Sequence, residues 1–202
     1  MTAILKVDTI QDTSGNNIIN ESSDTITIGA SGDTVAVPSG GKLTAPGHVL
    51  QVKQTTKTDS FSTNSTSMVD ITGFSVSITP NSTSNKILVM VNAGILSNSG
   101  SSGTLINLLR DSTNLISNTS GGSADTYNAW NVAGGGGMTN NDRKYNASPS
   151  ITYLDSPSST SSLTYKCQLC VNGGSTYAYL NQWSLNTDNA AVSTITVMEI
   201  AG

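Results

Sequence analysis

The chain has 202 residues, of which 11% are charged, and its 9 basic and 13 acidic residues give a formal net charge of −4. Binding to nucleic acid or to an anionic lipid surface requires clustered cations, so this balance argues against both. No apolar run approaches the ~18 residues of a membrane-spanning helix, and we expect no membrane insertion. The 31 serines and 27 threonines predict a surface kept in solution by hydrogen bonding rather than by charge.

The N-terminal 22 residues contain little that could form a core. Residues 4–10 (ILKVDTI) can form one strand, and residues 12–17 (DTSGNN) are typical of a turn. We treat 1–22 as a separate N-terminal segment.

A nine-residue unit follows and is written twice, as DTITIGASG in residues 24–32 and DTVAVPSGG in residues 33–41. Each copy offers one short β segment with two apolar side chains on the same face. Two such segments bury too little surface to offset the ~1–2 kcal/mol per residue that ordering the backbone costs. If the unit is ordered, its economical partners are copies of itself in a β-structured stalk. We assign residues 23–47 to this stalk and a Gly/Pro-bounded hinge.

Residues 48–202 read as one antiparallel β domain, because helical periodicity is almost absent and short β-branched runs alternate with Ser/Asn/Gly/Pro clusters. The number and spacing of the runs predict a jelly roll or β-sandwich. The expected strands are 49–56, 59–63, 68–71, 74–79, 86–96, 104–110, 114–117, a segment near 127–132, 150–154, 163–171, 176–183 and 194–200.

Two of these strands are apolar on both faces. In residues 86–96, Leu88 and Met90 lie opposite a second apolar row, and in the last strand Met198 and Ile200 do the same. One face of a two-layer sandwich normally meets solvent, so either a loop or another subunit is expected to cover the outer face. The residues predicted for the subunit interface or core are Leu88, Met90, Tyr179, Trp183, Met198 and Ile200.

The sequence holds no convincing catalytic or metal constellation. Cys167 and Cys170 fall within an expected strand, where positions three apart face opposite sides, so we expect two inert thiols. His48 lies alone in the hinge, and no carboxylate spacing marks a glycosidase pair. We expect no metal, no cofactor and no enzyme activity, with polysaccharide depolymerase as the remaining enzymatic alternative.

Aromatic residues in polar surroundings favour a binding role instead. One group flanks the glycine run of residues 134–137, and a second comprises Tyr177, Tyr179 and Trp183. Aromatic faces beside hydrogen-bonding side chains suit saccharides. The second group could equally pack in the core, so the first supplies the receptor-binding prediction: Tyr127, Trp130, Asn131, Asp142, Arg143, Lys144 and Tyr145.

Several segments resemble a family of small tail-fibre-like virion proteins of marine bacteriophages. They are QVKQTTKTDSFST (51–63), DITGFSVSITP (70–80), STSNKILV (82–89), LRD (109–111), YLDSP (153–157) and STITVMEI (193–200), together with the N-terminal LKVDTIQDTSGNNII (5–19). The resemblance covers nearly the whole chain.

This resemblance implies a homotrimeric protein on the surface of a phage particle, with a jelly-roll head similar to those of the complement and tumour-necrosis-factor type. It implies attachment to other virion proteins through the N-terminus, for which Ile4, Leu5, Val7 and Ile10 are the candidate residues. The head would then contact a glycan or protein on the host cell. A capsid-decorating or tail-assembly protein without a receptor role remains the alternative.

Overall fold

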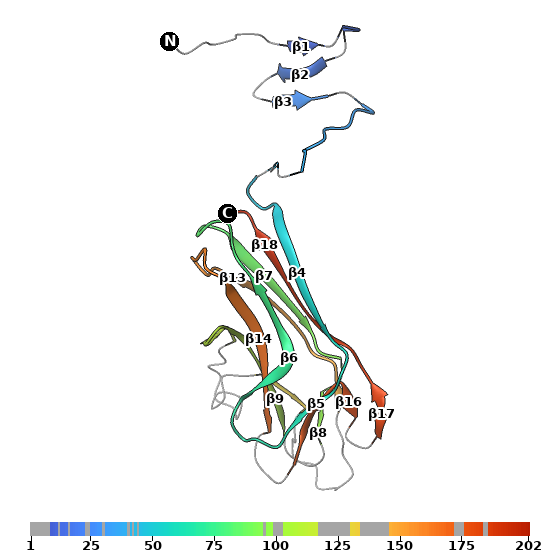
Figure 1. Ribbon diagram of the computed structural model, residues 1–202, viewed down its shortest axis with the longest axis vertical. Helices are drawn as coiled ribbons and strands as arrows, with labels where there is room; N and C mark the ends of the chain where they lie inside the picture. The colour runs from blue at the N-terminus through green and yellow to red at the C-terminus, as the bar shows by residue number, and fades with distance from the viewer. Residues whose placement is uncertain are drawn as a thin grey trace. The chain divides into compact units, whose positions relative to one another are not determined.

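The structure is a computed structural model, and it divides the chain into two compact units, Met1–Leu43 and Thr44–Gly202 (Figure 1). The residues it describes are 9–11, 13–15, 17–22, 25–29, 31–39, 41, 43, 45–94, 96–98, 103–116, 130–133, 146–171, 176–183 and 186–202. We call the two parts unit 1 and unit 2.

Unit 1 holds one antiparallel sheet of three strands, β1 (Thr9–Gln11), β2 (Asn17–Ser22) and β3 (Thr25–Ile28), in the order β1-β2-β3. The predicted turn joins β1 to β2. The first nine-residue copy supplies β3. In this single chain, residues 33–38 of the second copy contain no strand. A strand requires a hydrogen-bonded neighbour, and no described segment pairs with this one.

Unit 2 contains two larger antiparallel sheets, seen on either side of the sandwich in Figure 1. Sheet I has the order β13-β7-β18-β4, and sheet II has the order β10-β9-β14-β6, with β11 also paired to β9. Sheet I consists of β4 (Val49–Lys57), β7 (Lys86–Asn92), β13 (Ser150–Asp155) and β18 (Ser193–Ile200). Sheet II consists of β6 (Val69–Ile78), β9 (Thr104–Arg110), β10 (Thr113–Asn114), β11 (Trp130–Ala133) and β14 (Leu163–Val171).

A smaller sheet, β12-β8-β15-β5, extends one end of the sandwich, and β16 pairs with β17 beside it. The small sheet consists of β5 (Phe61–Thr63), β8 (Leu96–Asn98), β12 (Asn146–Ala147) and β15 (Ala178–Leu180), and the hairpin of β16 (Gln182–Trp183) and β17 (Asn186–Ala190).

The strand order is that of a jelly roll. Eight strands of the two large sheets are numbered 1 to 8 in chain order: β4, β6, β7, β9, β10, β13, β14 and β18. Their order across sheet I is then 1-8-3-6, and their order across sheet II is 2-7-4-5. This is the arrangement of two interlocked Greek keys. The predicted all-β, antiparallel fold is therefore confirmed, and the described residues contain no helix.

The core lies between sheets I and II, where alternate residues of each strand point inward. In β7 these are Ile87, Val89 and Val91, and in β18 they are Ile195 and Val197, all with no exposed surface. Residues of sheet II, such as Phe74, Leu108 and Tyr165, pack in the same core. The strand interiors thus alternate as the sequence predicts.

Two expected strands are each broken in the structure. Residues 86–96 divide into β7 and β8 at Gly94, where a Cβ atom would lie 2.7 Å from the carbonyl oxygen of Val192. Residues 176–183 divide into β15 and β16 at Asn181, which adopts a left-handed φ of 60°. Conversely, expected strands 68–71 and 74–79 are a single strand, β6, which continues through Gly73.

Candidate functional site

The outer face of sheet I carries a row of four apolar side chains that crosses all four strands. Leu88 of β7 lies opposite Met198 of β18, Met198 lies opposite Val52 of β4, and Leu88 lies opposite Leu154 of β13. Leu88 and Met198 are half-buried, whereas Leu154 and Val52 are 51% and 52% exposed. We call this set (Leu154, Leu88, Met198 and Val52) the apolar row.

The surroundings of the apolar row are uncharged apart from one lysine. Met90 and Thr196 form the next row on one side, and Lys86 and Ile200 form the next row on the other. Thr196 Oγ1 donates to Gln54 Oε1 at 3.0 Å on the same face. Among the described residues of these four strands, Lys86 is the one charged residue whose position in the alternation places it on the outer face.

The outer face of sheet II is different over β6 and β14. Lys166 Nζ contacts Asp70 Oδ2 at 2.7 Å, and Gln168 Nε2 donates to Asp70 Oδ1 at 2.8 Å. The hydrogen bond from Lys166 is the main reason why the pKa of Asp70 is below its ordinary value. Ser77 and Thr164 also share a hydrogen bond there. The outer face of sheet II thus carries polar and charged side chains over β6 and β14, whereas the outer face of sheet I carries the apolar row.

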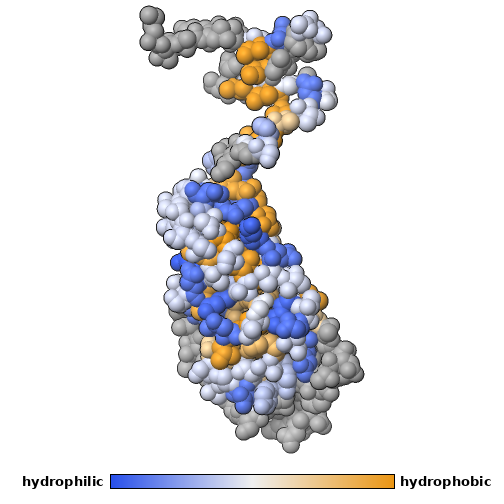
Figure 2. All heavy atoms as spheres, in the orientation of Figure 1, coloured by the Kyte–Doolittle hydropathy of each residue, from blue (hydrophilic) through white to orange (hydrophobic). Residues whose placement is uncertain are grey.

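Unit 1 repeats the apolar pattern on a smaller scale. Ile10, Ile19 and Ile28 lie opposite one another across β1, β2 and β3 and are 40%, 38% and 57% exposed. Val35 and Val37 of the second nine-residue copy are exposed as well. Figure 2 shows apolar residues gathered at the surface of this unit. This single three-stranded layer therefore leaves its isoleucine row exposed to solvent in one chain.

The point where the chain enters unit 2 is tightly held. Gly47 N donates to Ala201 O and Ala201 N donates to His48 O, both at 2.8 Å. The neighbouring Glu199 is fully buried and accepts hydrogen bonds from Asn85 Nδ2 (2.5 Å) and Gln51 Nε2 (2.6 Å), and from the backbone and side chain of Asn81.

The environment of Glu199 favours its charged form. Burial alone would raise the pKa of Glu199, but the hydrogen bonds from Asn85, Gln51 and Asn81 hold that pKa below its ordinary value. The carboxylate therefore joins β18, β4 and the loop that precedes β7 through amide donors. Glu199 thus connects three segments that are far apart in the sequence.

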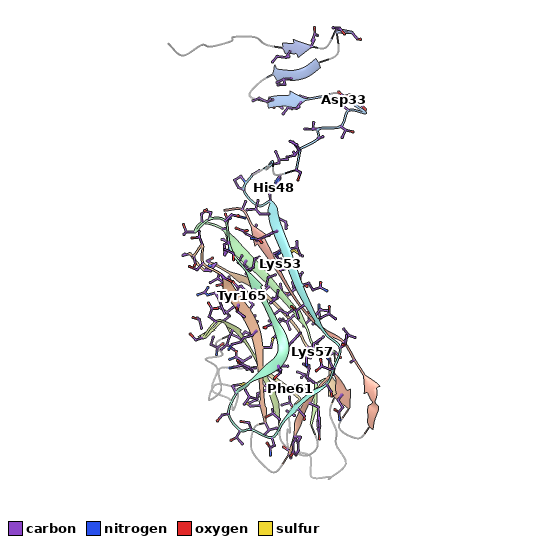
Figure 3. The ribbon with its side chains drawn as sticks, in the orientation of Figure 1. Asp33, His48, Lys53, Lys57, Phe61 and Tyr165 are labelled. Atoms are coloured by element: carbon purple, nitrogen blue, oxygen red, sulfur yellow. The ribbon has the colours of Figure 1, made fainter. Side chains whose placement is uncertain are left out.

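A second polar cluster links the two sheets inside the sandwich. Arg110 Nη1 of β9 contacts Asp155 Oδ2 of β13 at 2.6 Å, and Tyr165 Oη of β14 donates to the same oxygen at 2.7 Å (Figure 3 labels Tyr165). Burial, with the adjacent carboxylate as a further cause, raises the pKa of Tyr165. Asp155 is thus a buried residue that joins the sheets and does not form half of an exposed carboxylate pair.

The two cysteines are free and buried on opposite faces of β14, as predicted. Cys167 packs in the main core, and Cys170 packs with Leu105 and Met68. Burial raises the pKa of Cys167 to about 12 and that of Cys170 to about 11. No nucleophilic or redox role follows from thiols of this kind.

The structure brings together some of the predicted site residues and separates others. Leu88, Met90, Met198 and Ile200 share the outer face of sheet I, whereas Tyr179 lies in β15 and Trp183 in β16. Trp130 and Asn131 lie in β11, and Ile10 lies in β1. The remaining receptor and attachment predictions lie outside the described residues: Tyr127, Asp142, Arg143, Lys144, Tyr145, Ile4, Leu5 and Val7.

Sequence reasoning missed the two ends of the apolar row. Leu154 falls within the expected strand 150–154 and Val52 within the expected strand 49–56, but neither is among the predicted interface residues, although each alternates with residues that point inward. Their alignment with Leu88 and Met198 depends on strand register, which pairs residues as far apart in sequence as Val52 and Met198. Alternation in ITYLD was the available signal.

Within the described ranges, no three His, Cys, Asp or Glu side chains gather as metal ligands would, and no helix is long and apolar enough to span a bilayer.

The similarity of this chain to the solved structures described below is distant. No protein-family description matches the chain, and no curated protein matches it. A VP2 subviral particle of infectious bursal disease virus aligns with a TM-score of 0.32 and 14% identity over 76% of this chain and 38% of that one. The Gt strain of the same virus aligns with a TM-score of 0.31 and 16% identity over 98% of this chain and 47% of the other. The chain thus spans less than half the length of these proteins, and similarity at this level establishes neither a shared fold nor a shared function.

Proposed function

We propose that this chain is a structural protein of a bacteriophage particle, in which three copies form a short fibre with a jelly-roll head. The observation that carries the proposal is the presence of uncovered apolar rows in both units of one chain. The row in sheet I and the isoleucine row in unit 1 each lack a second layer among the described residues. Further copies of the same chain would cover both.

The number of copies comes from the resemblance to tail-fibre-like virion proteins. The apolar rows by themselves favour at least one further copy, and closed rotational symmetry would cover the rows of both units in every copy. In this arrangement unit 1 attaches to the particle and unit 2 carries the surface that meets the host. Three heads on each fibre and several fibres on each particle would let each contact be weak. No catalytic step is part of the proposal.

A capsid-decorating or tail-assembly role is the second candidate. The brevity of the repeat favours it, because its two copies in residues 24–41 reach only a short distance even at ~3.3 Å per extended residue. The head would then be a spacer or a clamp without a receptor.

Immunogold electron microscopy separates the two candidates. Antibodies raised against the full chain are applied to phage particles from infected cultures of the host. Gold at the tail supports the tail-fibre role. Gold distributed over the capsid contradicts that role and supports decoration, and particles without gold contradict both.

A further inference from the structure

Two tyrosines form an exposed aromatic pair at the small sheet. Tyr177, just before β15, is 45% exposed, and Tyr179 within β15 is half-buried. Their ring centroids lie 6.1 Å apart with an angle of 28° between the ring planes. The alternate residues Ala178 and Leu180 have no exposed surface. Both rings therefore project from the outer side of β15, while the other side of the strand packs into the core.

The strands around the pair contribute short polar residues and no charge. Tyr179 lies opposite Ser62 in β5 and Ser97 in β8, and Ser62 is exposed on the same face of the sheet. None of the four strands of the small sheet contains Asp, Glu, Lys, Arg or His. These described strands therefore place aromatic and hydroxyl groups, and no charged residue, beside Tyr179.

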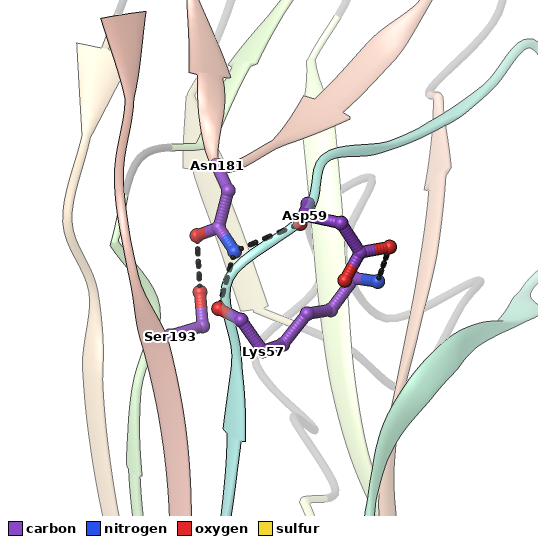
Figure 4. Close-up of polar contacts among 4 residues, drawn as sticks. All are labelled: Lys57, Asp59, Asn181 and Ser193. Carbon is purple, nitrogen blue, oxygen red and sulfur yellow. Dashed lines mark hydrogen bonds and ion pairs between the residues drawn. The ribbon is translucent and has the colours of Figure 1, made fainter.

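The end of β15 is fixed from behind by Asn181, which is 1% exposed (Figure 4). Asn181 Nδ2 donates to the carbonyl oxygens of Lys57 (2.9 Å) and Asp59 (3.2 Å), and Ser193 Oγ donates to Asn181 Oδ1 at 2.6 Å. These bonds tie β15 to the end of β4 and the start of β18. Asn181 directly follows the last residue of β15 and fixes the end of that strand. The tyrosines therefore lose little conformational entropy when a ligand binds.

The pair also lies at the end of unit 2 away from the chain's entry. His48 marks the entry beside the C-terminal residues, and Phe61, opposite Leu180 in the small sheet, lies near the other end (Figure 3). The nine residues of β4 between these ends rise ~3.3 Å each, or about 30 Å in all. A surface at this end is the one that a head attached through its N-terminus would present outward.

We propose that Tyr177 and Tyr179 form a stacking surface for a neutral saccharide. The C–H face of a pyranose ring is apolar and packs on an aromatic ring, while its equatorial hydroxyl groups require hydrogen-bonding partners such as the hydroxyl of Ser62. A phosphate, sulfate or carboxylate ligand would meet no cation on this sheet. The inference rests on the proposed function in one respect, that the saccharide belongs to the host surface.

The test uses the full chain and three immobilised neutral polysaccharides, a glucan, a mannan and a galactan, with heparin as the charged comparison. Binding is measured by biolayer interferometry for the unchanged protein, Tyr177→Ser, Tyr177→Phe and the control Val192→Ser, which replaces an apolar residue of similar exposure outside the small sheet. We expect binding to at least one neutral polysaccharide. Loss of the ring in Tyr177→Ser should weaken it about tenfold, whereas Tyr177→Phe should stay within about twofold, because the stacking face is retained.

Several outcomes overturn the inference. They are the absence of binding to all three neutral polysaccharides, binding to heparin alone, or equal binding by Tyr177→Ser and the unchanged protein. Native mass measurement of each variant separates this result from the proposed function. A trimer that binds no saccharide refutes the tyrosine surface alone, and a monomeric unchanged protein refutes the trimer whatever it binds. If Tyr177→Ser itself falls to monomers, the tyrosines are a subunit contact and the saccharide inference fails.

Discussion

Leu88 and Met198 lie directly opposite each other on adjacent strands β7 and β18, and both side chains point out of the sandwich. Large apolar side chains paired at this position gain nothing from the core of their own domain. They extend through Leu154 and Val52 to both edges of the sheet. This relationship is the basis for the expectation that the face is covered by another copy.

Leu154→Glu should break the contact between copies. Leu154 is half-exposed in the single chain, so a carboxylate is tolerated there in the monomer, but at the interface it would be buried without a partner at a cost of several kcal/mol. We expect the native mass to fall to that of one chain while the far-ultraviolet circular dichroism is unchanged. The matched control is Ser75→Glu on the polar outer face of sheet II. Loss of assembly in Ser75→Glu, or its persistence in Leu154→Glu, would place the interface elsewhere.

Asp155→Ala should destabilise unit 2, because it leaves Arg110 and the hydroxyl of Tyr165 without the carboxylate that joins them. Breaking a largely buried ion pair from one side costs about 2–4 kcal/mol, with Arg110 partly relieved by its exposure to water. The measurement is urea unfolding at neutral pH. A loss below about 0.5 kcal/mol, the size of an ordinary surface substitution, would mean that the cluster does not hold the sheets together.

Glu199 should make the stability of unit 2 depend on pH in the acid range. Its pKa in the folded protein lies below the ordinary value of 4.5. The stabilisation from its ionised form is therefore complete above pH 4.5 and is lost as the pH falls through the lower, folded-state pKa. Glu199→Gln should lose about 1–3 kcal/mol at pH 7, because an amide cannot accept all of the surrounding hydrogen bonds.

The difference between Glu199→Gln and the unchanged protein should shrink between pH 5 and pH 3 in urea titrations. Asp70→Asn provides the comparison, since the pKa of Asp70 is also lowered but the group is exposed on the surface of sheet II. It should shift the acid profile less than Glu199→Gln. A gap for Glu199→Gln that stays constant down to pH 3 would argue against ionised Glu199 as the source.

Cys167 and Cys170 should be unreactive in the folded protein. Burial raises the pKa of Cys167 to about 12 and that of Cys170 to about 11, so the thiolate fraction at pH 8 is minute and the sulfur atoms are shielded. A colorimetric thiol reagent should label neither cysteine in buffer. It should label both in about 6 M guanidinium chloride, which unfolds even very stable proteins. Rapid labelling in buffer would show that β14 opens.

The sequence predicts the strands of this fold better than their partners. The limits of β9 and β14 match the expected ranges, because each is a run of largely apolar residues that begins or ends beside polar turn residues. Alternation also places Leu88 and Met198 on the outer face. The breaks at Gly94 and Asn181 were not predictable, since they depend on contacts with Val192, Lys57 and Ser193, which are distant in sequence.

For the candidate sites too, the sequence predicts the strands but not how they pair. Alternation predicts which side chains face outward, but the apolar row exists only because register aligns four separate strands. The position of Tyr179 opposite Ser62 likewise depends on the register between β15 and β5. The second nine-residue copy has strand-forming residues and still forms no strand, because pairing requires a neighbour that the described part of one chain does not supply.

The most direct test of the account is the native mass of the full chain at micromolar concentration, measured by mass spectrometry and by light scattering. The account predicts one species at three times 20.8 kDa, which does not dissociate on moderate dilution because apolar rows in both units are covered. A single species at 20.8 kDa would contradict it.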